Sequence, residues 1–349
     1  MIRDHGHRAD IQLNAALSSA TLSQYSTAWK KFKRWLGSYN ISDPFTANTH
    51  ILFLYTSHLI YSSEQKSIGS STLEMSLAAI GYFFLLAGHN SPTDSTLCSY
   101  LVRSANRLLS SKKSACEPIT SAELHTVLKF HLTQKCSLKI RMHLTVFLLM
   151  FLGLLRFDDA ASILVYSDLM QFISCPHSAI IDGVLIFIPR SKTDQGWQGA
   201  WIAIGATHTR FCPIKLLQQL LKSGHYCQSH QSQDVGPLLR ATKQLYHPER
   251  QVLDQITASL STPIQTLSYH TFLASIQNLV QQAIPGKHIG LHAPRKGGAS
   301  HMAECDIDSR LVCGLGRWKQ GTTFADVYVK MLDGNMKRYF NLTRTLWNF

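Results

Sequence analysis

The chain has no pair of cysteines at the Cys-x-x-Cys spacing, although eight cysteines are scattered along its 349 residues. Scattered cysteines in a chain of this length are typical of reduced thiols in an intracellular protein, not of a disulfide framework. A short stretch with His and Cys at 225–230 has no second cluster to complete it. Because a zinc site needs about four ligands, this stretch predicts a polar loop, and the sequence predicts no metal centre.

Long apolar runs are also missing. The longest extends from Leu144 to Leu155, whereas a membrane span needs roughly 18 or more apolar residues. We interpret this run as a helix buried in a core. The first residues of the chain are polar and carry no apolar signal segment, and no internal repeat indicates a solenoid or a propeller.

Acidic side chains are scarce relative to basic ones. The chain has 21 Asp and Glu against 34 Lys and Arg, which gives a net charge of +13. With 45% hydrophobic and 16% charged residues, it should be globular and not disordered. The charge suits a polyanionic partner, most simply nucleic acid. The alternative is a basic soluble enzyme whose charge only aids solubility.

The length favours two domains. Residues 1–112 read as a helical bundle, with helices near 22–36, 49–60, 71–87 and 97–108. The polar stretch at 110–118 ends in Pro and is interpreted as the linker. Residues 113–349 form the second domain, with a C-terminal tail at 335–349. The first helix has one apolar face and one basic face, and the fourth also has a basic side. Such basic faces could simply be solvated, but in a basic DNA-binding protein they could also contact phosphates. We therefore predict DNA contacts at the following basic residues: Lys30, Lys31, Lys33, Arg34, Arg103 and Arg107.

The second domain is predicted to be mostly helical with a small antiparallel sheet. The buried helix that begins near Leu138 delivers Arg156 at its end. Two strand-like runs follow, at 184–189 and 200–204, and the loop between them places Lys192 near the tip of a hairpin. Further helices are expected at 266–283 and after His292, Asp306 and Thr322. The fold class is therefore mainly α with a small antiparallel sheet.

One set of residues could cleave a phosphodiester without a metal. Two guanidinium groups, Arg156 and Arg295, can hold the non-bridging oxygens of a phosphate. Tyr328, 33 residues past Arg295, can attack phosphorus and store the bond energy as a phosphotyrosine ester. Lys192 can protonate the departing 5′ oxygen, and His292 can move protons at the nucleophile. Pro294 suits the first turn of a helix, whose N-terminus favours a phosphate.

The order of these residues resembles that of the tyrosine recombinases, or phage-integrase-type recombinases. The resemblance extends over nearly the whole chain. Leu152-Gly153-Leu154-Leu155-Arg156-Phe157-Asp158-Asp159 matches the first-arginine motif, and Ser191-Lys192-Thr193-Asp194-Gln195 the hairpin-lysine segment. His292-Ala293-Pro294-Arg295 matches the His-x-x-Arg box. Leu315-Gly316-Arg317-Trp318 is similar to the next motif, in the form with Trp where His is commoner, as in Cre-type enzymes and those of eukaryotic DIRS and Crypton mobile elements.

The resemblance implies a helical core-binding domain followed by an α+β catalytic domain, both clamped around duplex DNA. It implies strand exchange through a 3′-phosphotyrosine intermediate, with the following catalytic residues: Arg156, Lys192, His292, Arg295, Trp318 and Tyr328. No metal or nucleotide cofactor is implied. The partners implied are double-stranded DNA and further copies of the chain, a dimer on each site and a tetramer in synapsis. A eukaryotic mobile element would place the protein in the nucleus.

Several alternatives remain open. The gap from Trp318 to Tyr328 is ten residues, slightly long for the family, and Tyr339 is the second candidate for the nucleophile. A type IB topoisomerase uses similar chemistry but reseals the same strand. A DNA-binding protein derived from a recombinase would bind without cleaving. The apolar stripe of the C-terminal tail favours docking on a neighbouring protomer, with packing on its own domain as the alternative.

Overall fold

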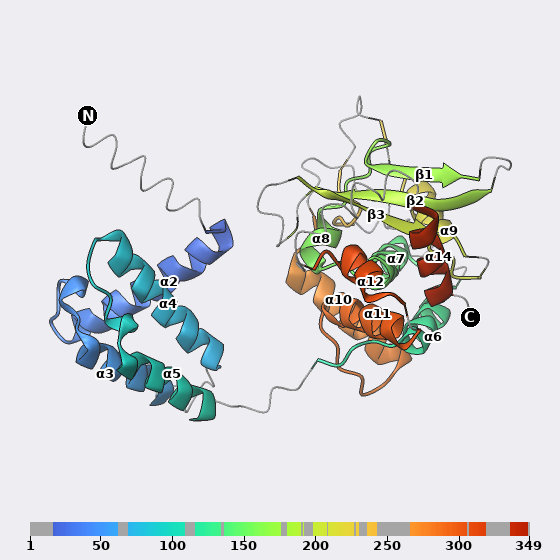
Figure 1. Ribbon diagram of the computed structural model, residues 1–349. Helices are drawn as coiled ribbons and strands as arrows, with labels where there is room; N and C mark the ends of the chain where they lie inside the picture. The colour runs from blue at the N-terminus through green and yellow to red at the C-terminus, as the bar shows by residue number, and fades with distance from the viewer. Residues whose placement is uncertain are drawn as a thin grey trace, which may run out of the picture. The chain divides into compact units, whose positions relative to one another are not determined.

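The chain divides into two compact units, residues 1–115 and 116–349. From the sequence, this division was predicted between residues 112 and 113. The computed structural model (Figure 1) describes residues 17–61, 69–108, 116–133, 136–175, 180–189, 191, 198–207, 209–226, 228–229, 236–242, 266–305, 307–318 and 336–347. Within these ranges no helix is long and apolar enough to cross a membrane.

The first unit is built from helices around an aromatic and aliphatic core. They are α2 (Ser19–Ser38), α3 (Thr49–Tyr61), α4 (Ser70–Leu86) and α5 (Thr96–Leu108), with the 3-10 helices η1 (Pro44–Thr46) and η3 (Pro92–Asp94). Trp29 of α2 stacks on Phe83 of α4 with ring centroids 5.0 Å apart, and Phe32 and Leu36 are fully buried. The apolar face predicted for the first helix is therefore its core face.

The basic residues of this unit lie on the opposite faces of their helices. Lys30, Lys31, Lys33 and Arg34 on α2 are all exposed, as are Arg103 and Arg107 on α5. The guanidinium of Arg103 lies over the ring of Tyr100, 5.8 Å from its centroid. These side chains are accessible to a polyanion.

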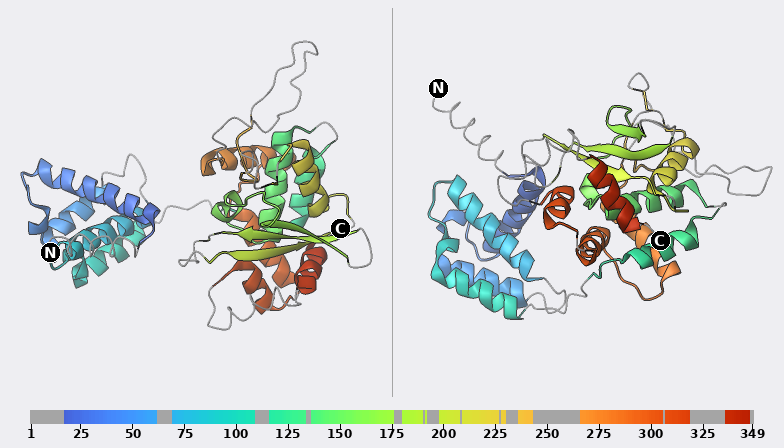
Figure 2. Two further views of the ribbon diagram at one scale, coloured as in Figure 1. Left: turned by 90° about the horizontal axis from the view of Figure 1, so that it is seen from above. Right: turned by 45° about the vertical axis from the view of Figure 1, so that its right-hand side comes forward.

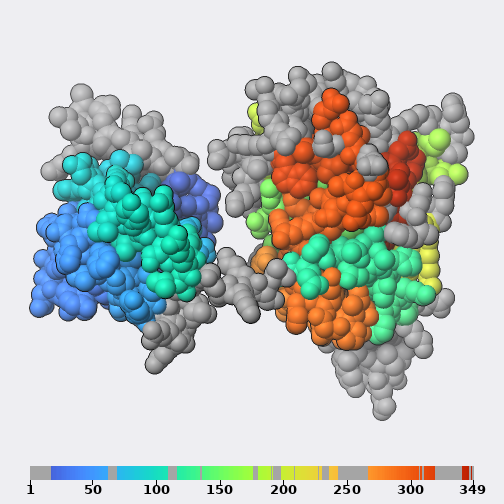
Figure 3. All heavy atoms as spheres, turned by 60° about the horizontal axis from the view of Figure 1, so that its bottom comes forward, coloured from blue at the N-terminus to red at the C-terminus, as the bar shows by residue number. Residues whose placement is uncertain are grey.

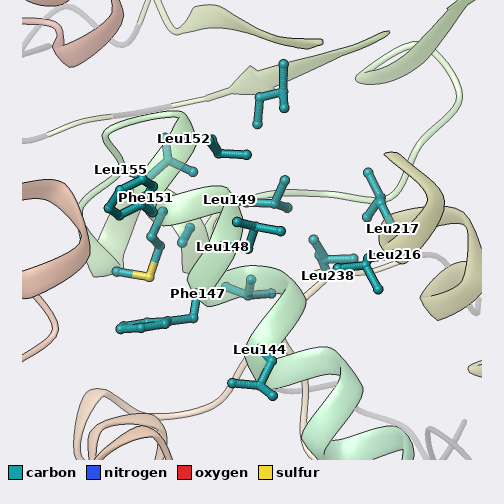
Figure 4. Close-up of a cluster of buried hydrophobic side chains, with 14 of the residues drawn as sticks. Leu144, Phe147, Leu148, Leu149, Phe151, Leu152, Leu155, Leu216, Leu217 and Leu238 are labelled. Carbon is teal, nitrogen blue, oxygen red and sulfur yellow. The ribbon is translucent and has the colours of Figure 1, made fainter. Parts of the chain in front are cut away.

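The second unit is organised around α7 (Leu138–Leu152). Every residue of α7 from Met142 to Leu152 is buried, because α6 (Ser121–His131), α9 (Pro213–Ser223), α10 (Tyr269–Ala283) and α11 (Ala293–Glu304) pack around it. Figure 4 shows its leucines facing Leu216, Leu217 and Leu238 across the core. The apolar run predicted to be a buried helix is thus the core of this unit, and it ends directly before Arg156.

A small sheet covers part of this core. Among the described residues, β1 (Met170–Ser174), β2 (Ile181–Ile188) and β3 (Ala200–Gly205) form an antiparallel sheet in the order β1-β2-β3. In the register of β2 and β3, Ile188 is paired with Ala200 and Gly183 with Gly205. The predicted hairpin strands are therefore present, although the loop with Lys192 lies outside the described residues.

Two short helices, α8 (Phe157–Ala161) and α12 (Ser309–Gly316), complete the part of the unit that carries the candidate site.

The C-terminal helix, α14 (Met336–Trp347), packs against β3 (Figure 2). A Cβ at Gly183 or at Gly205 would collide with Phe340, so the two paired glycines form a notch for its ring and backbone. Trp347 is buried and donates its indole N–H to Phe211 O at 2.8 Å. In this single chain the tail therefore packs on its own domain, which was the alternative predicted from the sequence, while docking on a neighbouring protomer stays a prediction.

Candidate active site

Arg156 is held at a tight junction between two helices. Helix α7 ends at Gly153, and Leu154 adopts a left-handed conformation with φ 48°. This turn places Arg156 at the N-cap of α8, where its backbone N–H donates to Asp159 Oδ2 at 2.9 Å. The buried end of α7 and the Asp159 carboxylate together fix the backbone that carries the Arg156 side chain.

The Arg156 guanidinium is only partly satisfied. Its Nη1 is buried and has no hydrogen-bond partner among the described residues. A buried N–H without an acceptor is destabilising, and an anionic oxygen is the acceptor that a guanidinium prefers. The hydrogen bond that Asp159 makes to Arg156 is to the backbone N–H.

Helix α11 delivers His292 and Arg295. His292 is its N-cap, and Pro294 lies in its first turn, where the missing N–H and the fixed φ of proline are tolerated. Arg295 is only 2% exposed. It donates to Leu154 O and, at 2.5 Å, to Gly316 O. Arg295 therefore connects the turn before Arg156 to the end of α12.

Trp318 lies on the same guanidinium. The Arg295 Cζ is 4.5 Å from the centroid of the Trp318 ring, which is a cation–π contact. A Cβ at Gly316 would collide with the Trp318 ring, so glycine at this position lets the ring fold back over the end of α12. The Trp predicted as a site residue thus holds Arg295 in place.

The positive charges of the site act on His292. Partial burial of the ring lowers the pKa of His292 below its ordinary value, and the charges of Arg295, Arg156 and Lys296 lower it further. The imidazole is consequently neutral at neutral pH. A neutral ring beside two guanidinium groups can accept a proton from a hydroxyl that approaches the same anion.

Gly297 and Gly298 let other backbone segments of the same chain pack closely against α11. A Cβ at Gly297 would collide with Ile119 O, and a Cβ at Gly298 with Phe151 O. Figure 3 shows the segment that follows residue 116 lying against α11, and Ile119 N donates to Ala293 O. Both glycines therefore permit packing within the unit.

The structure brings Arg156, His292, Arg295 and Trp318 into one region. The remaining predicted residues, Lys192 and Tyr328, lie outside the described residues, as does the side chain of Tyr339. Arg317 was not among the predicted site residues, although its Nη2 donates to Asp159 Oδ2 at 2.6 Å. Its place inside the Gly316-Arg317-Trp318 motif was the available signal. In the described part of the chain no group of His, Cys, Asp and Glu could hold a metal ion.

Known proteins were compared with this chain by sequence and by structure. No protein-family model matches the sequence, and no curated protein matches it. Among solved structures, the Tn1549 transposon integrase in complex with circular intermediate DNA is 11% identical with a TM-score of 0.50, over 93% of this chain and 94% of that one. The integrase from mycobacterium phage Brujita is 14% identical with a TM-score of 0.40, over 98% and 92%. The XerA recombinase is 13% identical with a TM-score of 0.36, over 99% of both.

The likeness to the Tn1549 integrase concerns the fold and extends over both units. The resemblance to the tyrosine recombinases read from the sequence is confirmed at this level. The predicted fold class, mainly helical with a small antiparallel sheet in the catalytic unit, is confirmed as well.

Proposed function

We propose that this protein is a DNA strand-exchange enzyme that cleaves and rejoins strands through a tyrosine. The observation that supports this most directly is the buried Arg156 Nη1, which has no acceptor among the described residues and lies in a region that also holds Arg295 and a neutral His292. A phosphodiester supplies the missing acceptor. The fold shared with the Tn1549 transposon integrase, solved with DNA, agrees with this substrate.

In the proposed reaction Tyr328 attacks phosphorus in line with the 5′ oxygen. His292 accepts the proton of the Tyr328 hydroxyl as the bond from its oxygen to phosphorus forms. The bond from phosphorus to the 5′ oxygen breaks, and Lys192 donates the proton that makes this oxygen a hydroxyl. Arg156 and Arg295 stabilise the charge on the non-bridging oxygens. A 5′ hydroxyl from a second duplex then reverses these steps.

The same proposal includes the roles of the two domains, the assembly on DNA and the location in the cell. Residues 1–112 bind DNA as a core-binding domain, and residues 113–349 carry the catalysis. The enzyme acts as a dimer on each site and as a tetramer in synapsis, serves a mobile element and, if that element is eukaryotic, works in the nucleus. Residues Lys30, Lys31, Lys33, Arg34, Arg103 and Arg107 contact phosphates.

A second candidate, a DNA-binding protein that has lost cleavage, is favoured by one observation. The Arg295 guanidinium is 2% exposed and donates to two carbonyls of its own chain. An arginine that clamps a phosphate must direct donors to that phosphate. For the proposed enzyme, DNA binding therefore has to draw Arg295 partly away from these carbonyls.

The experiment is covalent trapping on DNA with a nick close to the cleavage site. Loss of the short 5′-hydroxyl fragment leaves nothing to reverse the reaction, so the protein–DNA adduct accumulates. We expect an adduct with the natural chain and none with Tyr328→Phe, while Tyr339→Phe serves as the matched control and remains active. Binding without any adduct supports the second candidate. An adduct mapped to Tyr339 overturns the assignment of the nucleophile.

A further inference from the structure

One turn of the chain is linked to both arginines of the candidate site, to Arg295 by direct contact and to Arg156 through Asp159. Gly316 O accepts a hydrogen bond from Arg295 at 2.5 Å, and the Trp318 ring lies 4.5 Å from the Arg295 Cζ. Between them, Arg317 Nη2 donates to Asp159 Oδ2 at 2.6 Å. The Gly316-Arg317-Trp318 turn therefore contacts Arg295 directly and reaches Arg156 through Asp159.

The Arg317–Asp159 ion pair is buried. The side chains of Arg317 and Asp159 are 5% and 0% exposed. Breaking a buried pair by removing one partner leaves an uncompensated charge, which has to find another partner or become solvated. Arg317 also adopts a left-handed conformation, with φ 53° and ψ 42°, which disfavours a residue with a Cβ. The packing around Arg317 thus holds an unfavourable backbone conformation in the position that makes the pair.

Asp159 could otherwise pair with Arg156. Its Oδ2 already accepts the Arg156 backbone N–H at 2.9 Å, three residues away. Its Oδ1 is buried without a partner among the described residues, as is Arg156 Nη1. A carboxylate this close competes with the substrate phosphate for the Arg156 guanidinium. Both groups carry anionic oxygens that can accept hydrogen bonds from the same N–H donors.

We infer that Arg317 is a positioning residue that neutralises Asp159 and so keeps the Arg156 guanidinium available to the scissile phosphate. With Arg317 present, the charge of the Asp159 carboxylate is balanced by Arg317. The positive charges of Arg156 and Arg295 are then not offset by Asp159 and can act on the phosphate. Without Arg317, the Asp159 carboxylate pairs with Arg156 and withdraws it. This inference rests on the proposed function, because it assigns a role in the same reaction.

The test compares Arg317→Met with the double variant Arg317→Met/Asp159→Asn in adduct formation on nicked DNA. Two substrates are used, one with the ordinary scissile phosphate and one with a methylphosphonate, in which a methyl group replaces a charged oxygen. We expect Arg317→Met to slow cleavage of the ordinary substrate by about 10²-fold, the loss typical of one positioned donor. The loss shrinks on the methylphosphonate, because the neutral group depends less on Arg156.

The double variant removes the competing carboxylate together with its partner. We expect it to recover most of the lost rate, and Arg317→Lys, which keeps the charge, to stay near the natural chain. Equal slowing of Arg317→Met on both substrates is the result of a general structural defect and overturns the inference. A folded double variant as slow as the single variant overturns it too. Absence of any adduct with the natural chain is instead the failure of the proposed function.

A crystal structure of the Arg317→Met variant gives a readout that does not depend on activity. We expect the Arg156 guanidinium to be hydrogen-bonded to the Asp159 carboxylate in that structure. If Arg317→Met does not fold, the double variant, which leaves no unpaired charge, takes its place, and we expect its Arg156 side chain to remain where it lies in the natural chain. Arg156 left unpaired with Asp159 in Arg317→Met, or displaced in the double variant, overturns the inference.

Discussion

His143 is a titratable residue inside the core of the second unit. It is fully buried on α7, where its Nδ1 lies 2.6 Å from Ser275 Oγ and its ring packs edge-on against Phe272 at 5.3 Å. Burial, together with the nearby charge of Lys139, lowers the pKa of His143 from its ordinary value of 6.5 to about 4. Folding therefore requires the neutral imidazole.

This burial predicts a loss of stability in acid. His143 binds a proton in the unfolded chain below about pH 6.5 but in the folded chain only below about pH 4, so its contribution is complete above pH 6.5 and is lost as the pH falls towards 4. The loss amounts to roughly 3 kcal/mol by pH 4. We expect His143→Gln to flatten this part of the curve of unfolding free energy against pH, measured by urea unfolding. The exposed His270→Gln is the control, and an unchanged slope in His143→Gln contradicts the prediction.

At the residue scale, the sequence predicted a set of side chains, four of which the structure brings into one region, but it did not predict how they pair. Arg156, His292, Arg295 and Trp318 could be found because each stands in a short local motif. The pairing of Asp159 with Arg317 joins residues 158 positions apart. It depends on a left-handed turn at Arg317. This conformation is uncommon for a residue other than glycine, so an arginine in the sequence does not predict it. Local sequence order therefore predicted which residues lie together, whereas tertiary packing determines their partners.

At the scale of elements, α14 completes the second unit. Phe340, Leu342 and Trp347 are at most 6% exposed, and Thr343 Oγ1 accepts the Gly205 N–H at 2.6 Å. Arg344 also pairs with Asp182 at the start of β2. Aromatic burial, a backbone hydrogen bond and an ion pair thus attach the same helix to the sheet of its own chain.

Replacement of Phe340 tests this attachment. We expect Phe340→Ala to destabilise the isolated monomer by about 3–5 kcal/mol, the usual cost of removing a buried Phe. Thr345→Ala, an exposed change on the same helix, is the control with little effect. The measurement is urea unfolding at protein concentrations that keep the chain monomeric. Equal stability of the two variants is the result expected if the helix leaves its own sheet and docks elsewhere.

The sequence predicted elements with a strong periodic pattern better than those without one. The helices of the first unit and the buried α7 carry long apolar faces, and their bounds were close to those found. Strand β1 was not predicted. Only Met170 of its five residues is buried, so it lacks the alternation that identifies a strand. This strand forms because it pairs with β2, and that pairing cannot be predicted from the five residues of β1 alone.

At the scale of the whole molecule, basic charge is distributed over both units. The net charge is +13, and the exposed basic residues of α2 lie opposite its core face. Such residues contact DNA through its phosphates, which are the same for every sequence. Affinity should therefore be largely electrostatic, whereas the choice of a target sequence requires contacts that charge alone does not provide.

This distribution predicts a strong dependence of DNA binding on salt. Each phosphate that is neutralised contributes about 0.9 to the slope of log affinity against log salt. We expect Lys33→Gln/Arg34→Gln to reduce that slope by up to about 2. The control is Lys129→Gln/Lys222→Gln, which removes the same charge from exposed sites on the second unit. Equal reductions in both pairs mean that net charge, and not the α2 surface, governs binding.

The notch at Gly183 and Gly205 also has a consequence for folding during synthesis, because the helix that fills it is made much later than the strands that form it. Gly205 and Thr343, which joins α14 to β3, are 138 residues apart. A ribosome that adds about 5–20 residues per second takes roughly 7–28 s to cover this distance. During this interval the nascent sheet presents an open apolar notch. Until residues 336–347 have been synthesised, the notch lacks the Phe340 ring that fills it.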